Sequence, residues 1–198
     1  MQATAGDAWN VACVPQNPFQ ANCPEENGPD VDFAAATILL TEGERDILIA
    51  GQKSGDTFGI NPDDGTVIWK TNVGRGGTHT GGIHFGMATN GKTLFVPIGD
   101  DNDGVNSMDD AKPGIYGLDP YTGEIKWSQP VLVNACGDRL VCAPGASSPA
   151  TALSDLVFQG YMDGMLRIHD SETGEILWEF DTDQEFETIS GATAHGGS

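Results

Sequence analysis

Positive charge is scarce in this chain of 198 residues. It contains 9 Lys and Arg against 29 Asp and Glu, which gives a formal net charge of −20. The phosphates of nucleic acids and the headgroups of anionic membranes would repel such a surface, so neither is an expected partner. The acidic residues occur in turn-like segments and predict a solvated surface. The run from Asp100 to Asp103 could instead form a calcium loop, but its oxygen spacing does not match an EF-hand.

Long hydrophobic runs and helical periodicity are also missing. The longest apolar run, Phe33 to Leu40, is broken by Thr37 and is far too short to cross a bilayer. Met1 is followed by polar residues without a signal-peptide core, so the chain is expected either to be cytosolic or to have lost a leader. With 27 Gly and 11 Pro, the composition is typical of many short strands joined by tight turns. Almost no helix is expected.

The common catalytic signatures are absent as well. The sequence has no G-x-S-x-G elbow, P-loop, H-E-x-x-H, C-x-x-C or C-x-x-C-H. His79 and His84 lie on either side of a glycine pair, but without a third ligand they are not expected to bind a metal. Arg139 and Arg167 are predicted to be isolated surface charges.

The four cysteines fall into two close pairs in Gly- or Pro-rich segments. Cys13 pairs in sequence with Cys23, and Cys136 with Cys142. Two local disulfides in an exported protein are the favoured interpretation, and buried free thiols in a cytosolic protein are the alternative.

One phrase occurs three times and ends each time on Trp. Its copies are residues 61–69, 119–127 and 170–178, which places the three tryptophans 58 and 51 residues apart. In each copy an Asn or Asp can accept a backbone N–H, and a Gly can take a positive φ, so each copy predicts a hairpin. The following Trp is expected at the start of an outer strand, where its ring fills the gap to the neighbouring sheet.

This spacing predicts an all-β fold, namely a β-propeller of four-stranded antiparallel blades. Blades need about 40 to 50 residues each, so the chain would contain about four blades. Residues 1–46 are expected to form a loop-rich N-terminal segment, and residues 47–198 to form the successive blades.

Four further segments follow one another in a fixed order. They read GPDVDF (28–33), GQKSG (51–55), GGIHFGMA (81–88) and GYMDGMLR (160–167). From about Trp9 to its end, the chain resembles the quinoprotein alcohol dehydrogenases, and among them the polyvinyl-alcohol-dehydrogenase-like proteins. The resemblance implies an eight-bladed periplasmic propeller that holds pyrroloquinoline quinone (PQQ) and calcium at its axis. It further implies oxidation of an alcohol, with polyvinyl alcohol as the candidate substrate and electrons passed to a cytochrome c.

The resemblance also assigns roles to particular residues. Asp30 matches the catalytic carboxylate that also binds calcium, with Asp32 as second choice, and Lys53 matches the cation that polarises the quinone oxygens. His84 and Phe85 match a pair that touches the cofactor, although Phe85 lacks the indole donor of the family's Trp. The alternatives are polar turn residues for the two aspartates, a lysine head in water for Lys53, and ordinary inner-strand packing for His84 and Phe85.

About four blades cannot close a ring of eight. The chain is therefore expected to be part of a longer gene product, with the remaining calcium ligands upstream of Met1 and another blade opening at residues 188–198, and it is not expected to turn over alone. Two other functions stay open. One is a non-catalytic binding or scaffold propeller of the outer-membrane assembly lipoprotein type, and the other is an interaction domain that self-associates through its exposed edges.

Overall fold

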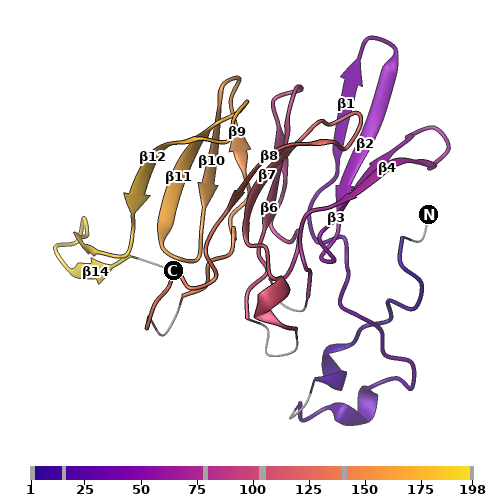
Figure 1. Cartoon of the computed structure of the whole chain (residues 1–198). Helices are drawn as coiled ribbons and strands as arrows, with labels where there is room; N and C mark the ends of the chain where they lie inside the picture. The colour runs from indigo at the N-terminus through magenta and orange to yellow at the C-terminus, as the bar shows by residue number, and fades with distance from the viewer. Residues whose placement is uncertain (1–2, 15–16, 78–79, 103–105, 140–141, 197–198) are drawn as a thin grey trace.

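The chain folds into a row of antiparallel sheets (Figure 1). The computed structural model describes residues 3–14, 17–77, 80–102, 106–139 and 142–196. Three sheets have four strands each, and every one is built from four consecutive strands. This arrangement, together with a final two-stranded sheet, confirms the predicted all-β propeller of about four blades.

The strands follow one another along the chain with short connections. The first sheet contains β1 (Ile38–Glu42), β2 (Arg45–Gly51), β3 (Asp56–Ile60) and β4 (Val67–Asn72). The second contains β5 (Ala88–Thr89), β6 (Leu94–Ile98), β7 (Gly114–Leu118) and β8 (Ile125–Pro130). The third contains β9 (Thr151–Ala152), β10 (Leu156–Gly160), β11 (Met165–Asp170) and β12 (Ile176–Asp181). The final hairpin pairs β13 (Glu185–Glu187) with β14 (Thr193–His195).

Helical structure in the described ranges is limited to three single 3₁₀ turns. They are η1 (Val11–Cys13), η2 (Gln20–Asn22) and η3 (Met108–Asp110). None of the helices among the described residues is long and apolar enough to cross a bilayer.

The segment 1–46 is not loop throughout, because β1 begins at Ile38 and pairs with β2. The first four-stranded sheet therefore starts earlier than the expected boundary at residue 47. The part that precedes β1 carries η1 and η2 and extends away from the sheets in Figure 1. Both predicted disulfides are present, Cys13–Cys23 in this segment and Cys136–Cys142 between β8 and β9.

The repeated phrase forms the turn between the last two strands of each sheet. In the second sheet, Oδ1 of Asp119 accepts the N–H groups of Tyr121 and Thr122, both at 2.9 Å. Gly123 in the same turn has a φ of +72°, a conformation that costs glycine little because it has no Cβ. The phrase therefore acts as the predicted hairpin turn, and the Trp follows on the outer strand.

Neighbouring sheets are joined by a contact between a Trp and a Gly of the next repeat. Trp69 on β4 packs against Gly123, and Trp127 on β8 packs against Gly174. A Cβ on Gly174 would lie 2.5 Å from Cε3 of Trp127, so only glycine fits there. Both rings are 8% exposed, whereas Trp178 on β12 is 46% exposed.

The hydrophobic core lies between the sheets. Ile49 of the first sheet packs in one cluster with Leu94 and Val96 of the second. Phe95 of the second sheet lies in another cluster with Val157 of the third. The second sheet thus buries one face against the first sheet and the other against the third, as expected for a propeller blade.

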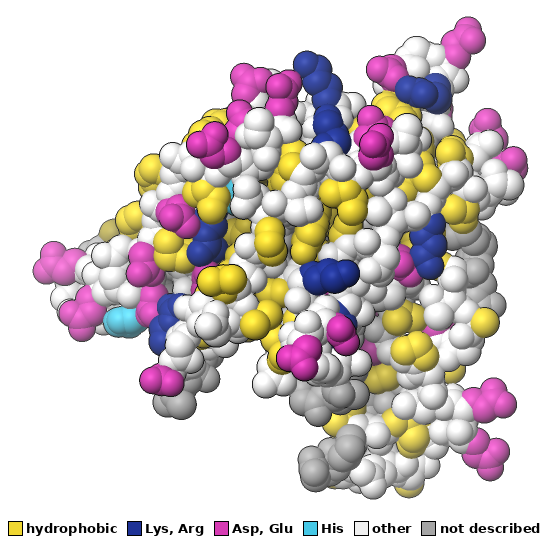
Figure 2. Space-filling view, in the orientation of Figure 1, with side chains coloured by type: hydrophobic (Ala, Val, Ile, Leu, Met, Phe, Trp, Pro, Cys, Tyr) yellow, Lys and Arg dark blue, Asp and Glu magenta, His cyan; other side chains and the backbone are white. Residues whose placement is uncertain are grey.

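The acidic surface predicted from composition is visible on the face drawn in Figure 2. Asp and Glu side chains lie mainly at its projecting tips, with few Lys and Arg between them. Asp63 and Asp64 in the first repeated turn are exposed, in agreement with that prediction. Asp100 is an exception and is described below.

Candidate functional site

A buried ion pair joins two segments that are far apart in sequence. Lys53 lies in the turn between β2 and β3, and Asp30 lies in the segment before β1. Their Nζ and Oδ2 atoms are 2.6 Å apart, and the side chains are 7% and 2% exposed. The backbone N–H of Lys53 also donates to the carbonyl of Asp32 at 2.9 Å, which holds the two segments side by side. The Lys53 head is thus not in water, and the two residues converge.

His84 lies beside this pair, in the segment that leads into β5. Its ring is half-buried, and it meets the Phe85 ring edge-on with 4.7 Å between the centroids. Burial is the main cause that lowers the pKa of His84 below its usual value, and the charge of Lys53 lowers the pKa further. Asp30 is among the acidic neighbours that act in the opposite direction. His84 is therefore a neutral imidazole at pH 7.

Three buried polar atoms near this pair have no hydrogen-bond partner among the described residues. They are Oδ1 of Asp30, Nδ1 of His84 and Oδ1 of Asp101. Buried polar atoms are nearly always paired in folded proteins, and leaving one unpaired costs about 1–3 kcal/mol. Such a set is typical of a site that a polar ligand completes.

Charge coupling between Lys53 and His84 can be measured directly. Lys53→Met removes a nearby cation and leaves Asp30 without its partner, and both changes favour the protonated imidazole. We therefore expect the pKa of His84 to rise in this variant, as followed by an NMR titration of the ring. His169 is the control, because burial lowers its pKa too but its Nδ1 contacts the carbonyl of Gly174 in the third sheet. A pKa of His84 that does not change on removal of Lys53 would show that the two side chains do not share a site.

The distribution of acidic residues in the sequence did not indicate that Asp100 is buried and binds backbone amides. Its side chain is fully buried, and it accepts hydrogen bonds from four backbone N–H groups. The prediction that it is a solvated turn residue is therefore wrong. The partners come from several loop segments, so no local spacing in the sequence could have indicated them.

The described residues contain no cluster of three or more His, Cys, Asp and Glu side chains that could hold a metal ion. Asp30, the calcium ligand that the resemblance implies, therefore belongs to no such cluster among the described residues. The expectations for His79 and Asp103 fall outside the described residues.

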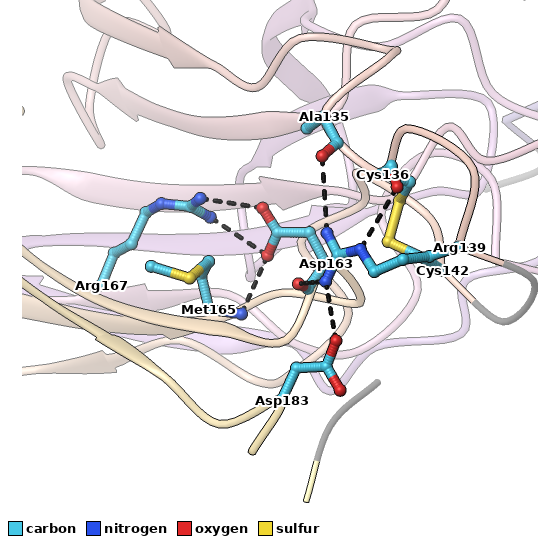
Figure 3. Close-up of a disulfide and its surroundings, with 8 residues drawn as sticks. All are labelled: Ala135, Cys136, Arg139, Cys142, Asp163, Met165, Arg167 and Asp183. Carbon is cyan, nitrogen blue, oxygen red and sulfur yellow. Dashed lines mark hydrogen bonds and ion pairs between the residues drawn. A yellow bond between two sulfur atoms is a disulfide. The ribbon is translucent and has the colours of Figure 1, made fainter.

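The two arginines predicted to be isolated surface charges are both engaged (Figure 3). The guanidinium of Arg139 donates to the carbonyls of Ala135, Cys136 and Asp163 and to the carboxylate of Asp183. These bonds attach the loop closed by the Cys136–Cys142 disulfide to the third sheet.

The prediction of an isolated surface charge is also wrong for Arg167. Its side chain is 12% exposed and forms ion pairs with Asp163 at 2.8 Å and with Glu179 at 2.9 Å. The guanidinium also lies over the ring of Tyr161, with Cζ 4.5 Å from the ring centroid. Their distant partners could not be assigned from the sequence, because Asp183 and Glu179 lie 44 and 12 residues away from Arg139 and Arg167.

Three four-stranded sheets that are joined by Gly–Trp contacts define a β-propeller of the PQQ type. The family described as "Outer membrane protein assembly factor BamB" matches residues 59–195, and the chain belongs to this family of PQQ-type propellers. Two curated relatives carry a more specific name. The chain is 36% identical to a polyvinylalcohol dehydrogenase from a Pseudomonas species over 99% of its length, and 32% identical to one from Sphingopyxis sp. (strain 113P3) over 100%. It spans about 30% of the length of each of these relatives.

Solved structures show the same fold. The quinohemoprotein alcohol dehydrogenase ADHIIG from Pseudomonas putida HK5 matches with a TM-score of 0.55 and 13% identity, covering 85% of this chain and 34% of that one. The quinohemoprotein alcohol dehydrogenase from Comamonas testosteroni matches with a TM-score of 0.54 and 16% identity over 80% and 32%. BamB from Moraxella catarrhalis matches with a TM-score of 0.50 and 18% identity over 77% and 36%. At these identities the likeness concerns the fold alone.

Proposed function

We propose that this chain is the part of a PQQ-dependent alcohol dehydrogenase that presents a catalytic carboxylate and a cation to the quinone. The buried pair of Asp30 and Lys53, with a free carboxylate oxygen beside a neutral imidazole, is the observation that carries the proposal. The names of the two curated relatives support an alcohol, with polyvinyl alcohol as the first candidate substrate.

The residues present fit the chemistry of PQQ. When bound, this cofactor supplies an ortho-quinone that accepts a hydride from the alcohol carbon, and a nearby cation makes such a quinone more electrophilic. Lys53 is that cation in the proposal, and the half-buried ring of Phe85 offers an aromatic surface for a planar group. Phe85 has no indole N–H, so the hydrogen bond of the family's Trp is not available from this position.

In the proposal, the two carboxylate oxygens of Asp30 have different roles. Oδ2 is bound to the ammonium of Lys53, whereas Oδ1 is free to accept a proton. In the proposed reaction, Oδ1 takes the hydroxyl proton of the alcohol, as a general base within hydrogen-bond reach. Lys53 holds the carboxylate in place during this step, and burial excludes water from it.

In the proposal, Asp30 is the one described residue that would bind a calcium ion. Calcium takes about 6–8 oxygen ligands, and the described residues near Asp30 do not supply such a set. Further ligands would have to come from elsewhere in a longer protein, so no reaction step is assigned to the ion. The proposal places the protein in the periplasm, because two disulfides fit an oxidising compartment. The cytochrome c acceptor rests on the family resemblance alone.

A scaffold propeller is the second candidate function. The description of the matching family and the likeness to BamB from Moraxella catarrhalis favour it. A scaffold does not need a buried cation that is paired with a carboxylate, one oxygen of which is free. It would also not bind a quinone. Binding of PQQ therefore separates the two candidates.

The activity test uses the full-length gene product with PQQ, calcium and an artificial electron-accepting dye. We expect dye reduction with simple alcohols or polyvinyl alcohol, and a decrease in kcat of about 10²–10⁴-fold for Asp30→Asn, because the general base is lost. Asp63→Asn is the matched control, since Asp63 is an exposed turn carboxylate of the same sheet. Absence of dye reduction with every alcohol, or equal rates for Asp30→Asn and the wild type, would contradict the enzyme function.

A further inference from the structure

Asp100 combines features that are unusual for an acidic residue on a strongly acidic protein. Its side chain is fully buried, and its φ of +44° is the one positive value among the described non-glycine residues. A positive φ is uncommon outside glycine and is often found where the surrounding structure fixes a loop. A carboxylate kept in this conformation, away from water, has to be bound by groups that the fold places around it.

The groups that bind Asp100 are all backbone amides. Oδ1 accepts the N–H groups of Gly76 at 3.0 Å and Gly82 at 2.9 Å. Oδ2 accepts those of Arg75 at 2.6 Å and Lys112 at 3.0 Å. Hydrogen bonds to a charged acceptor are about twice as strong as neutral ones, so this carboxylate is a strong organiser of the backbone. It joins the segment between β4 and β5 to both ends of the segment between β6 and β7.

The glycines held by Asp100 lie directly on the backbone of Lys53. A Cβ on Gly76 would lie 2.7 Å from the Lys53 carbonyl oxygen, and a Cβ on Gly82 would overlap the same oxygen. The amide of Ile83 also donates to the carbonyl of Gln52 at 3.3 Å. The segment that leads to His84 is therefore pressed against the turn that carries Lys53.

Arg75 strengthens this connection from the other side. Its backbone N–H binds Asp100, while its guanidinium donates to the carbonyl of Asp101 at 2.8 Å. The two loops thus hold each other through reciprocal bonds at neighbouring residues. A change at Asp100 is expected to release both.

We propose that Asp100 is a positioning residue for the quinone site, because its carboxylate holds Gly76 and Gly82 against the backbone of Lys53 and so places Lys53 and His84 for the cofactor. The inference rests on the proposed function for its ligand. Its mechanical part, the placement of Lys53, stands on the hydrogen bonds of Asp100 and on the close approach of the two glycines to the Lys53 backbone. Asp100 touches neither Lys53 nor Asp30 in any of the bonds above, so its effect on the site passes through the two glycines.

The test replaces Asp100 with Asn, which keeps the side-chain shape and tolerates a positive φ. An amide carries one oxygen and one NH₂ group, so two of the four backbone donors lose their acceptor. We expect hydrogen exchange at the amides of Lys53 and Gly82 to become about tenfold faster, as measured by mass spectrometry on the full-length protein. We also expect the Kd for PQQ, measured by calorimetry with calcium present, to rise by about 10–100-fold.

Asp163→Asn is the matched control for a general loss of stability. Asp163 is also buried, and it lies in the turn of the third sheet that corresponds to the Lys53 turn. Its carboxylate binds Arg167 and the amide of Met165, which lie in the third sheet, and has no hydrogen bond to Gly76 or Gly82. We expect this variant to leave exchange at Lys53 and the affinity for PQQ as in the wild type.

A second variant keeps the inference testable if Asp100→Asn does not fold. Gly82→Ala retains the Asp100 carboxylate but places a methyl group against the Lys53 carbonyl, and we expect the same loss of PQQ affinity. Unchanged exchange at Lys53, or unchanged PQQ affinity in a protein whose wild type binds PQQ, would overturn the role of Asp100. If the wild type does not bind PQQ, the proposed function fails, and exchange at Lys53 alone decides whether Asp100 positions that residue.

Discussion

Replacing Lys53 with Met is expected to destabilise the fold by about 3–5 kcal/mol and to abolish PQQ binding. Met has a similar length but no charge, so it leaves the buried carboxylate of Asp30 without its cation. The cost of an uncompensated buried charge is large because water cannot reach it. Urea unfolding measures the free energy, and calorimetry with PQQ measures binding.

The double variant Asp30→Asn with Lys53→Met separates stability from function. With both charges removed, no uncompensated ion remains, so we expect most of the lost stability to return. PQQ binding should not return, because the cation that we propose to face the quinone is still missing. A single Lys53→Met variant that unfolds at the wild-type urea concentration would show that the pair is not buried in solution.

Trp127→Ala is expected to lower the free energy of unfolding by about 3–5 kcal/mol. The ring is packed between the second and third sheets, 6.0 Å from the centroid of Phe95, and its Nε1–H donates to the carbonyl of Ser171 at 3.2 Å. Removing it leaves a cavity beside Gly174 and one unpaired carbonyl. Thermal and urea unfolding of the variant measure the loss.

Trp178→Ala is the matched control in the third copy of the same phrase. Its ring is 46% exposed and stacks on Phe180 of its own strand, with 5.8 Å between the centroids. We expect a loss of less than about 1 kcal/mol, as for a largely exposed contact. Equal losses for the two tryptophans would contradict the difference in their packing.

The repeated phrase was sufficient to predict the sheets and the place of each Trp. Its signals are local, because an Asx side chain, a Gly and the following Trp act within nine residues, and each copy forms its own hairpin. The spacing of the copies then gave the size of a blade. The start of β1 at Ile38 was not predicted, because residues 1–46 as a whole were expected to form a loop-rich segment.

The candidate site was harder to predict from the sequence than the fold. Asp30 and Lys53 were proposed from a family resemblance, and nothing in their 23-residue separation indicates an ion pair. Asp100 was missed because its four partners are backbone amides, which every residue type except Pro provides. The prediction for Arg139 and Arg167 was wrong for a related reason, since Asp163 meets Arg139, and Glu179 meets Arg167, only after the third sheet has formed.

The contact between Trp127 and Gly174 has a consequence for how such proteins can grow. One stretch of nine residues contributes to two such contacts. Its glycine packs against the Trp ring of the preceding repeat, and its own Trp ring packs against the glycine of the following repeat. Duplicating a gene segment that contains this stretch therefore creates a new module already shaped to fit both of its neighbours. The array can therefore lengthen by duplication without new complementary surfaces. This suits a family whose members differ in function but keep the same arrangement of sheets.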